Sequence, residues 1–303
     1  MNTKFKFMKY RKIAGIISIT LFIISVGFLF FRGLSLGLDF SGGTLIEVSY
    51  ETPISLEEVR SSLESNGYAD SQVVNFGTNL DVLIKVADQS GNSSVGEDIF
   101  NILSNQEIPI ELKRVEFVGP QVGDELRDQG GLGMLIALFM ILIYVAFRFQ
   151  YKFALGAVTA LGHDVVIILG LFSIFSWDFD LTVLAALLAV IGYSLNDTIV
   201  VSDRIRENFR KKRRSEAIPL IDRSLNQMLG RTLITSLTTL LVLFALLIFG
   251  GDAIQNFSIA LIIGVIAGTY SSIYIVCNTL ISLNVIADDL AVRKSERFDD
   301  GMP

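Results

Sequence analysis

Six long apolar segments constrain this chain more than any other feature of its sequence. Each is close to the roughly 20 residues that a helix needs to cross the hydrocarbon core of a bilayer. The composition agrees, because 51% of the residues are hydrophobic and only 18% are charged. We therefore predict a membrane all-α bundle whose spans are residues 13–31, 132–147, 153–175, 181–201, 233–249 and 257–286.

The charged residues are segregated, and their distribution predicts an orientation. The stretch 32–131 holds 17 acidic and 6 basic residues, which argues against nucleic-acid binding there. Basic residues collect instead in 1–12, at Arg148 and Lys152, and in 203–230. The positive-inside rule places such segments in the cytoplasm. The prediction is two cytoplasmic tails (1–12 and 287–303), a basic cytoplasmic loop (203–230) and a domain outside the membrane (32–131).

The stretch 32–131 predicts a small α+β domain inserted after the first span. Alternating apolar residues predict strands at 44–50, 71–76, 80–86 and 110–118, with helices at 55–66 and 95–104. The order βαββαβ is typical of a ferredoxin-like sandwich. Ser55-Leu-Glu-Glu58 has the pattern of a capping box, and Asp39 is expected to cap a turn in a glycine-rich stretch.

The sequence offers no constellation that would make the chain an enzyme. No carboxylate pair with a supporting histidine, metal-ligand spacing or nucleotide-binding motif is visible. We expect no enzymatic activity, no cofactor and no metal site.

Asp197 is the most informative single residue because it lies inside the predicted span 181–201. An aspartate at the centre of a bilayer costs roughly 2.5–3.5 kcal/mol on insertion scales, so such residues face the protein interior and are usually functional. The polar residues that accompany Asp197 on this helix are Tyr193, Ser194, Asn196 and Thr198.

Two other spans carry polar residues. In the fifth, Arg231, Thr235 and Thr238/Thr239 recur at helical spacing at the same end of the membrane as Asp197. Antiparallel packing would bring the Arg231 guanidinium to the Asp197 carboxylate, either as a static ion pair or as a pair that titrates. In the third span, His163 and Asp164 lie mid-membrane; proton handling and a structural hydrogen bond to a neighbouring helix both remain open for them.

Four separated motifs occur in order along the chain. They are GLDFSGGTLIEV before the external domain, GHDVVIILGLFSI in span three, AVIGYSLNDTIVVSDRIREN through span four and GRTLITSLTTL in span five. With these motifs the chain resembles, from about residue 10 to residue 290, the SecF family. These are membrane subunits of the bacterial SecD–SecF protein-export complex, within the resistance-nodulation-division superfamily.

The resemblance implies an inner-membrane protein with residues 32–131 in the periplasm. It implies SecD as partner, often with YajC, beside the SecYEG channel and a translocating preprotein. In this family the proton-motive force assists export after the motor ATPase, with the proton as the only coupling species. The family's relay aspartate, in an N-D-T motif, falls on Asp197, and its relay arginine, in R-T-x-x-T-S, falls on Arg231.

Two rival interpretations remain at this stage. One is a half-transporter of the same superfamily that exports lipids or small molecules. The other is a non-transporting scaffold that holds SecD, in which Asp197 and Arg231 would form a fixed pair.

Overall fold

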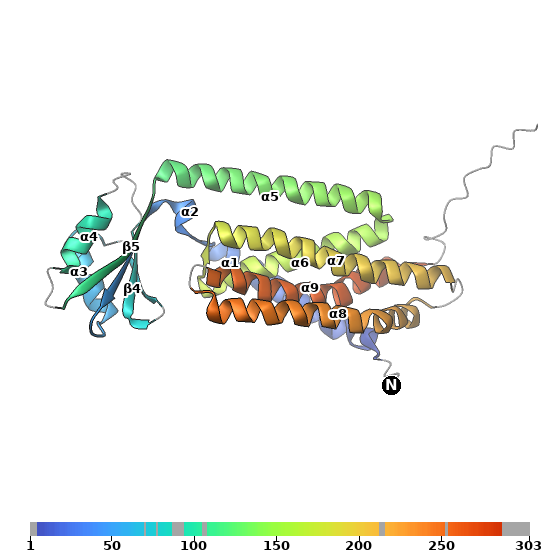
Figure 1. Cartoon of the computed structure of the whole chain (residues 1–303). Coiled ribbons are helices and arrows are strands. Elements are labelled where there is room, and N and C mark those ends of the chain that lie inside the picture. Colours follow the sequence, from blue (N-terminus) through green and yellow to red (C-terminus); the bar gives the residue numbers. More distant parts are fainter. Residues whose placement is uncertain are drawn as a thin grey trace, which may run out of the picture.

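The structure is a computed structural model, and it describes residues 5–69, 71–76, 78–86, 94–104, 108–211, 216–251 and 254–286. Over these residues it has six helices of membrane-spanning length and composition, together with one small α+β domain (Figure 1). Both features confirm the predicted fold class. The long helices are α1 (Arg11–Phe31), α5 (Pro120–Arg148), α6 (Tyr151–Phe175), α7 (Leu181–Lys211), α8 (Ala217–Phe249) and α9 (Gln255–Ser282); the 3₁₀ turn η1 (Phe7–Tyr10) precedes α1.

Three helices, α5, α7 and α8, extend ten residues or more beyond the predicted spans. Helix α5 begins at Pro120, so the polar residues that precede the predicted span 132–147 form its first turns. Helix α7 continues to Lys211 and α8 begins at Ala217, so most of the predicted loop 203–230 is helical. Hydropathy marks only the part of a helix inside the membrane. The polar turns are held by side-chain pairs one turn apart, such as Arg204 to Glu207 at 2.7 Å.

Several predicted segments lie outside the described residues. They are 1–4 of the N-terminal tail, the predicted C-terminal tail 287–303 and the basic residues Lys212, Arg213 and Arg214.

The α+β domain has the predicted βαββαβ order. Its strands β2 (Gly43–Tyr50), β3 (Gln72–Phe76), β4 (Thr78–Val86) and β5 (Ile110–Val118) form an antiparallel sheet in the order β3-β4-β2-β5. Helices α3 (Leu56–Ser65) and α4 (Val95–Ser104) close its core, which contains the fully buried Ile46, Val48, Val59, Leu63, Val82, Ile84, Ile99 and Leu103. The capping-box prediction is wrong, because Ser55 makes no side-chain cap hydrogen bond.

Tyr50 gives this domain a specific alkaline sensitivity. Its hydroxyl is buried and has no hydrogen-bond partner among the described residues, and burial raises the pKa of Tyr50 to about 12. Because this folded-state pKa lies above the ordinary value of 10.0, the stabilisation from Tyr50 is complete below pH 10 and is lost as the pH rises toward 12. We expect wild type to lose about 3 kcal/mol over that window that Tyr50→Phe does not lose.

Chemical unfolding of both purified proteins in detergent between pH 8 and pH 12 measures this difference. At pH 8 the variant should be as stable as wild type or slightly more stable, since phenylalanine leaves no buried hydroxyl unpaired. Parallel pH curves for the two proteins would contradict the prediction.

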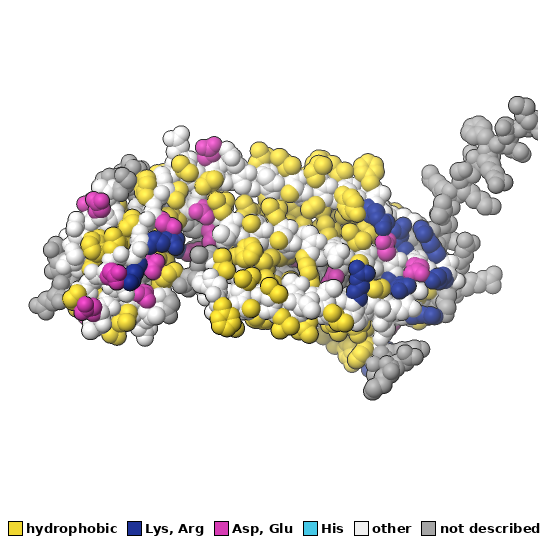
Figure 2. All heavy atoms as spheres, viewed as in Figure 1, with side chains coloured by type: hydrophobic (Ala, Val, Ile, Leu, Met, Phe, Trp, Pro, Cys, Tyr) yellow, Lys and Arg dark blue, Asp and Glu magenta, His cyan; other side chains and the backbone are white. Residues whose placement is uncertain are grey.

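The membrane helices pack around α9, which contacts α6, α7 and α8 most extensively. Small residues set these contacts: a Cβ on Gly264 of α9 would lie 2.1 Å from Val190 on α7. Helix α5 stands apart as a long rod leading away from the domain (Figure 1). Lysine and arginine side chains gather at the end of the bundle far from the domain, beyond a belt of apolar side chains (Figure 2).

Short segments connect the domain to the near end of the bundle. Strand β1 (Ser35–Leu36) pairs in parallel with β6 (Asp178–Phe179), which lies between α6 and α7. From the domain itself, Lys85 of β4 forms an ion pair with Asp178. The short helix α2 (Leu38–Ser41) contributes Asp39, whose Oδ2 accepts a hydrogen bond of 3.1 Å from the Leu181 amide. Asp39 is therefore a cap, as predicted, but it caps the first turn of α7.

Candidate functional site

Asp197 lies deep in the bundle on α7, with only 5% of its surface exposed. Its distance along α7 from Leu181 is about 24 Å at helical rise. The Oδ2 atom is buried and has no hydrogen-bond partner among the described residues. A buried carboxylate oxygen without a partner is costly. A proton or a cationic group at this atom would therefore be favourable.

Arg231 lies at the same depth on α8, about 27 Å along that helix from Phe249. Arg231 is close enough to Asp197 for their side chains to attract each other electrostatically. However, among the described residues no ion pair within 4 Å joins the two, and Arg231 is exposed on the outside of the bundle. The geometry thus brings the predicted pair to one level of the membrane without closing a salt bridge.

The threonines after Arg231 are occupied within their own helix. Thr235 Oγ1 donates to the Arg231 carbonyl at 3.1 Å, Thr238 Oγ1 to Ile234 at 2.9 Å, and Thr239 Oγ1 to Thr235 at 2.9 Å. Such bonds satisfy hydroxyls in apolar surroundings. No described hydrogen bond links these three side chains to Asp197.

Asp164 forms the best-connected polar cluster of the bundle and is fully buried. Its Oδ2 accepts hydrogen bonds from Ser194 Oγ on α7 at 2.6 Å and from Ser271 Oγ on α9 at 2.7 Å. Its Oδ1 lies 3.1 Å from His163 Nδ1. Three helices therefore meet at one carboxylate.

The remaining predicted residues of α7 divide between inside and outside. Thr198 is buried, Asn196 is exposed, and the hydroxyl of Tyr193 is buried without a described partner.

His163, on α6, packs near an aromatic side chain of α9. The ring of His163 lies 6.3 Å from that of Tyr270, and the buried Nε2 of His163 has no described partner.

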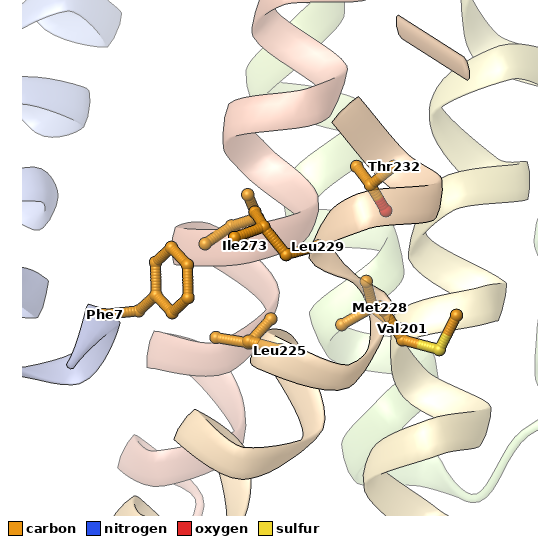
Figure 3. Close-up of a pocket in the computed structure, with 7 residues that line it drawn as sticks. All are labelled: Phe7, Val201, Leu225, Met228, Leu229, Thr232 and Ile273. Carbon is orange, nitrogen blue, oxygen red and sulfur yellow. The ribbon is translucent and has the colours of Figure 1, made fainter. Parts of the chain in front are cut away.

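On the basic side of Asp197 the bundle encloses a small cavity of about 10 Å³, room for a single water at most. Figure 3 shows Phe7 of η1 and side chains of α7, α8 and α9 around it. The lining residues are Phe7, Val201, Leu225, Met228, Leu229, Thr232 and Ile273. Only one of these seven lining residues, Thr232, is polar, so the cavity is mainly apolar.

Sequence reasoning missed the link between the third and sixth spans. Ser271 is one of several polar residues in span six, but its partner Asp164 is 107 residues away. It also missed the contact of Lys85 with Asp178, which no local pattern indicates. No three His, Cys, Asp or Glu side chains come together as a metal site within the part of the chain that the structure describes.

Comparison with known proteins places the chain in a family. The family described as "Protein export membrane protein SecD/SecF, C-terminal" matches residues 99–285, and the "SecD/SecF GG Motif" matches residues 27–54. The chain belongs to the SecD/SecF family. The first match begins within α4, extends past the end of α9 and includes both Asp197 and Arg231.

Full-length relatives in the SecD/SecF family carry the name "Protein translocase subunit SecF". The protein from Pseudomonas aeruginosa is 51% identical over 308 residues and covers all of both chains. That from Escherichia coli O157:H7 is 42% identical and covers 99% of this chain and 94% of the relative.

A solved structure of SecDF from Thermus thermophilus, a translocon-associated membrane protein, superposes with a TM-score of 0.84 at 36% identity. A second structure of SecDF, in the "Super-membrane-facing form", gives a TM-score of 0.70. The chain covers 39% of the length of either SecDF chain, so it corresponds to one part of those longer proteins.

Proposed function

We propose that this chain, together with SecD, uses inward proton movement to help complete Sec-dependent export of preproteins after the motor ATPase. The observation that carries the proposal is the state of Asp197. It is a carboxylate at membrane depth, with one buried oxygen unpaired and a cation, Arg231, at the same level of the membrane.

In the proposed cycle the Asp197 carboxyl takes a proton from the periplasmic side and releases it to the cytoplasmic side. When ionised it attracts Arg231, and when protonated it no longer does, so α7 and α8 settle in different relative positions. A proton that crosses 100 mV supplies roughly 2.3 kcal/mol. That is enough to bias an equilibrium between two conformations that differ by a few kcal/mol.

SecD is the proposed partner in the membrane. The outer side of α7 exposes small residues, Ala185, Ala189 and Gly192, followed by Asn196, and such a surface suits close packing of another helix. Arg231 is exposed near this level on α8. A neighbouring subunit would shield both polar groups from lipid.

The proposed orientation follows the charges. The basic end of the bundle lies in the cytoplasm, with both termini, and the α+β domain lies in the periplasm of a bacterial inner membrane. We also propose the family's further contacts for this chain, namely the SecYEG channel, YajC and the emerging preprotein.

Proton flow in vesicles tests the proposal. The chain is reconstituted with SecD, a membrane potential and a pH gradient are imposed, and the internal pH is followed with a trapped dye. We expect proton entry clearly above that of vesicles with SecD alone, and stimulation of preprotein export when SecYEG and the motor ATPase are present. Proton entry no greater than with SecD alone would refute the proposal and favour the scaffold interpretation.

A further inference from the structure

Two buried carboxylates lie in the membrane bundle in opposite hydrogen-bonding states. Asp197 has an oxygen without a partner among the described residues, whereas each oxygen of Asp164 has at least one. Hydrogen bonds to a carboxylate are shorter and stronger than those between neutral groups. A carboxylate that accepts such bonds from hydroxyls on two other helices is therefore held firmly in place. The arrangement at Asp197 suits a group that changes its partner, and the arrangement at Asp164 suits a group that holds neighbouring helices together.

Asp164 is linked to Asp197 through a single turn of helix. Ser194, which donates to Asp164 at 2.6 Å, precedes Asp197 by three residues on α7. Residues three apart on a helix share a face. The hydrogen bond that holds Ser194 against α6 therefore also sets the position of Asp197 along the bundle and the direction in which its side chain points.

The packing beside this bond leaves α7 little freedom of its own. A Cβ on Gly268 of α9 would lie 3.0 Å from the Cβ of Ser194, and Gly264 lies even closer to Val190, one turn earlier. Ser271, on the same helix α9, donates the second hydrogen bond to Asp164 at 2.7 Å. The backbones of α7 and α9 thus meet where the carboxylate of α6 joins them.

We propose that Asp164 is a positioning residue that clamps α7 to α6 and α9 through Ser194 and Ser271 and so aligns Asp197, without itself carrying the proton. This rests on the function proposed above for Asp197. The Ser194 hydroxyl donates its proton to Asp164, and no described hydrogen bond joins Ser194 to Asp197.

Two substitutions separate clamping from proton carrying. Asp164→Asn keeps a carbonyl oxygen that accepts both serine hydroxyls but removes the ionisable group. Asp164→Leu keeps similar bulk and accepts nothing. Ile168→Ala on the same helix, one turn away and fully buried, serves as a control for general loss of stability.

In reconstituted complexes with SecD, we expect Asp164→Leu to lower proton flow per folded complex at least tenfold. Asp164→Asn and Ile168→Ala should stay within about twofold of wild type, although Ile168→Ala should melt earlier. If Asp164→Asn abolishes flow while α7 stays in place, Asp164 carries protons and the proposal is wrong. If Asp164→Leu retains flow, the clamp is wrong.

Electron paramagnetic resonance reads the position of α7 without reference to proton flow. Spin labels replace Tyr151 at the start of α6 and Arg210 near the end of α7, both exposed, in a Cys277→Ala background that lacks other cysteines. The distance distribution between them should broaden in Asp164→Leu and remain as in wild type in Asp164→Asn.

A distribution unchanged in Asp164→Leu would overturn the inference. If wild type passes no protons, the proposed function fails, and these distances alone then decide whether the clamp exists.

Discussion

Replacing Asp197 with asparagine is expected to abolish proton-driven export while leaving the protein folded and bound to SecD. Asparagine has nearly the same volume but neither takes up nor releases a proton, and it presents no charge to Arg231. We expect proton flow in reconstituted vesicles to fall to the level of SecD alone. Proton-stimulated export should fall with it, and extraction yield and melting temperature should stay close to wild type.

Ser202→Ala is a matched control for this substitution. Ser202 lies on the same helix, and its buried hydroxyl has no hydrogen-bond partner among the described residues, so its removal should change neither flow nor stability. Full proton flow in Asp197→Asn would show that Asp197 is not the coupling group.

Exchanging the two charges distinguishes the relay from a scaffold. A fixed structural pair tolerates reversal, so Asp197→Arg combined with Arg231→Asp would restore function if the pair only held the helices. No closed ion pair joins the two residues in the described structure, and Asp197 is buried while Arg231 is exposed. We therefore expect the double variant to be as inactive as we expect each single variant to be.

Gly170→Val is expected to prevent stable folding of the membrane bundle. A Cβ at Gly170 of α6 would lie 2.2 Å from the Cβ of Ser25 on α1 and 2.6 Å from its Cα. Because one of these atoms is backbone, α1 would have to move away as a whole. Overpacking of this kind costs about 3 kcal/mol or more, which should appear as a sharp loss of monodisperse protein after extraction and a lower melting temperature.

Gly162→Val tests whether position, rather than the loss of a glycine, matters. Gly162 is on the same helix, and a Cβ there would meet nothing within 4 Å, so this variant should behave like wild type. Ser25→Gly should partly rescue Gly170→Val by removing two of the atoms in conflict. Equal stability of the two valine variants would contradict the assigned packing of α1 on α6.

The sequence was sufficient for features governed by local periodicity. The strands predicted at 44–50 and 110–118 follow from an apolar pattern with a period of 2 residues, and the structure has strands at Gly43–Tyr50 and Ile110–Val118. The extension of α7 to Lys211 was not predicted, because hydropathy does not report helix outside the membrane. Its polar turns depend on pairs such as Lys211 with Glu207.

The candidate site was predictable residue by residue but not as an arrangement. Asp197 and Arg231 are conspicuous because charge is rare in spans. The role of Ser271 depends on Asp164, and nothing in either local sequence indicates the other. The polar threonines of α8 suggested a shared face, yet their hydroxyls bond to carbonyls of the same helix, a choice that spacing alone does not reveal.

The cap at the start of α7 has a mechanical consequence. Asp39 holds the Leu181 amide, and β2 of the four-stranded sheet begins two residues after α2 ends. Helix α7 therefore cannot slide along its axis without either breaking this bond or pulling the first strand of the sheet with it. A displacement of α7 that begins at Asp197 would therefore pull on strand β2 of the α+β domain, through a linkage only a few residues long.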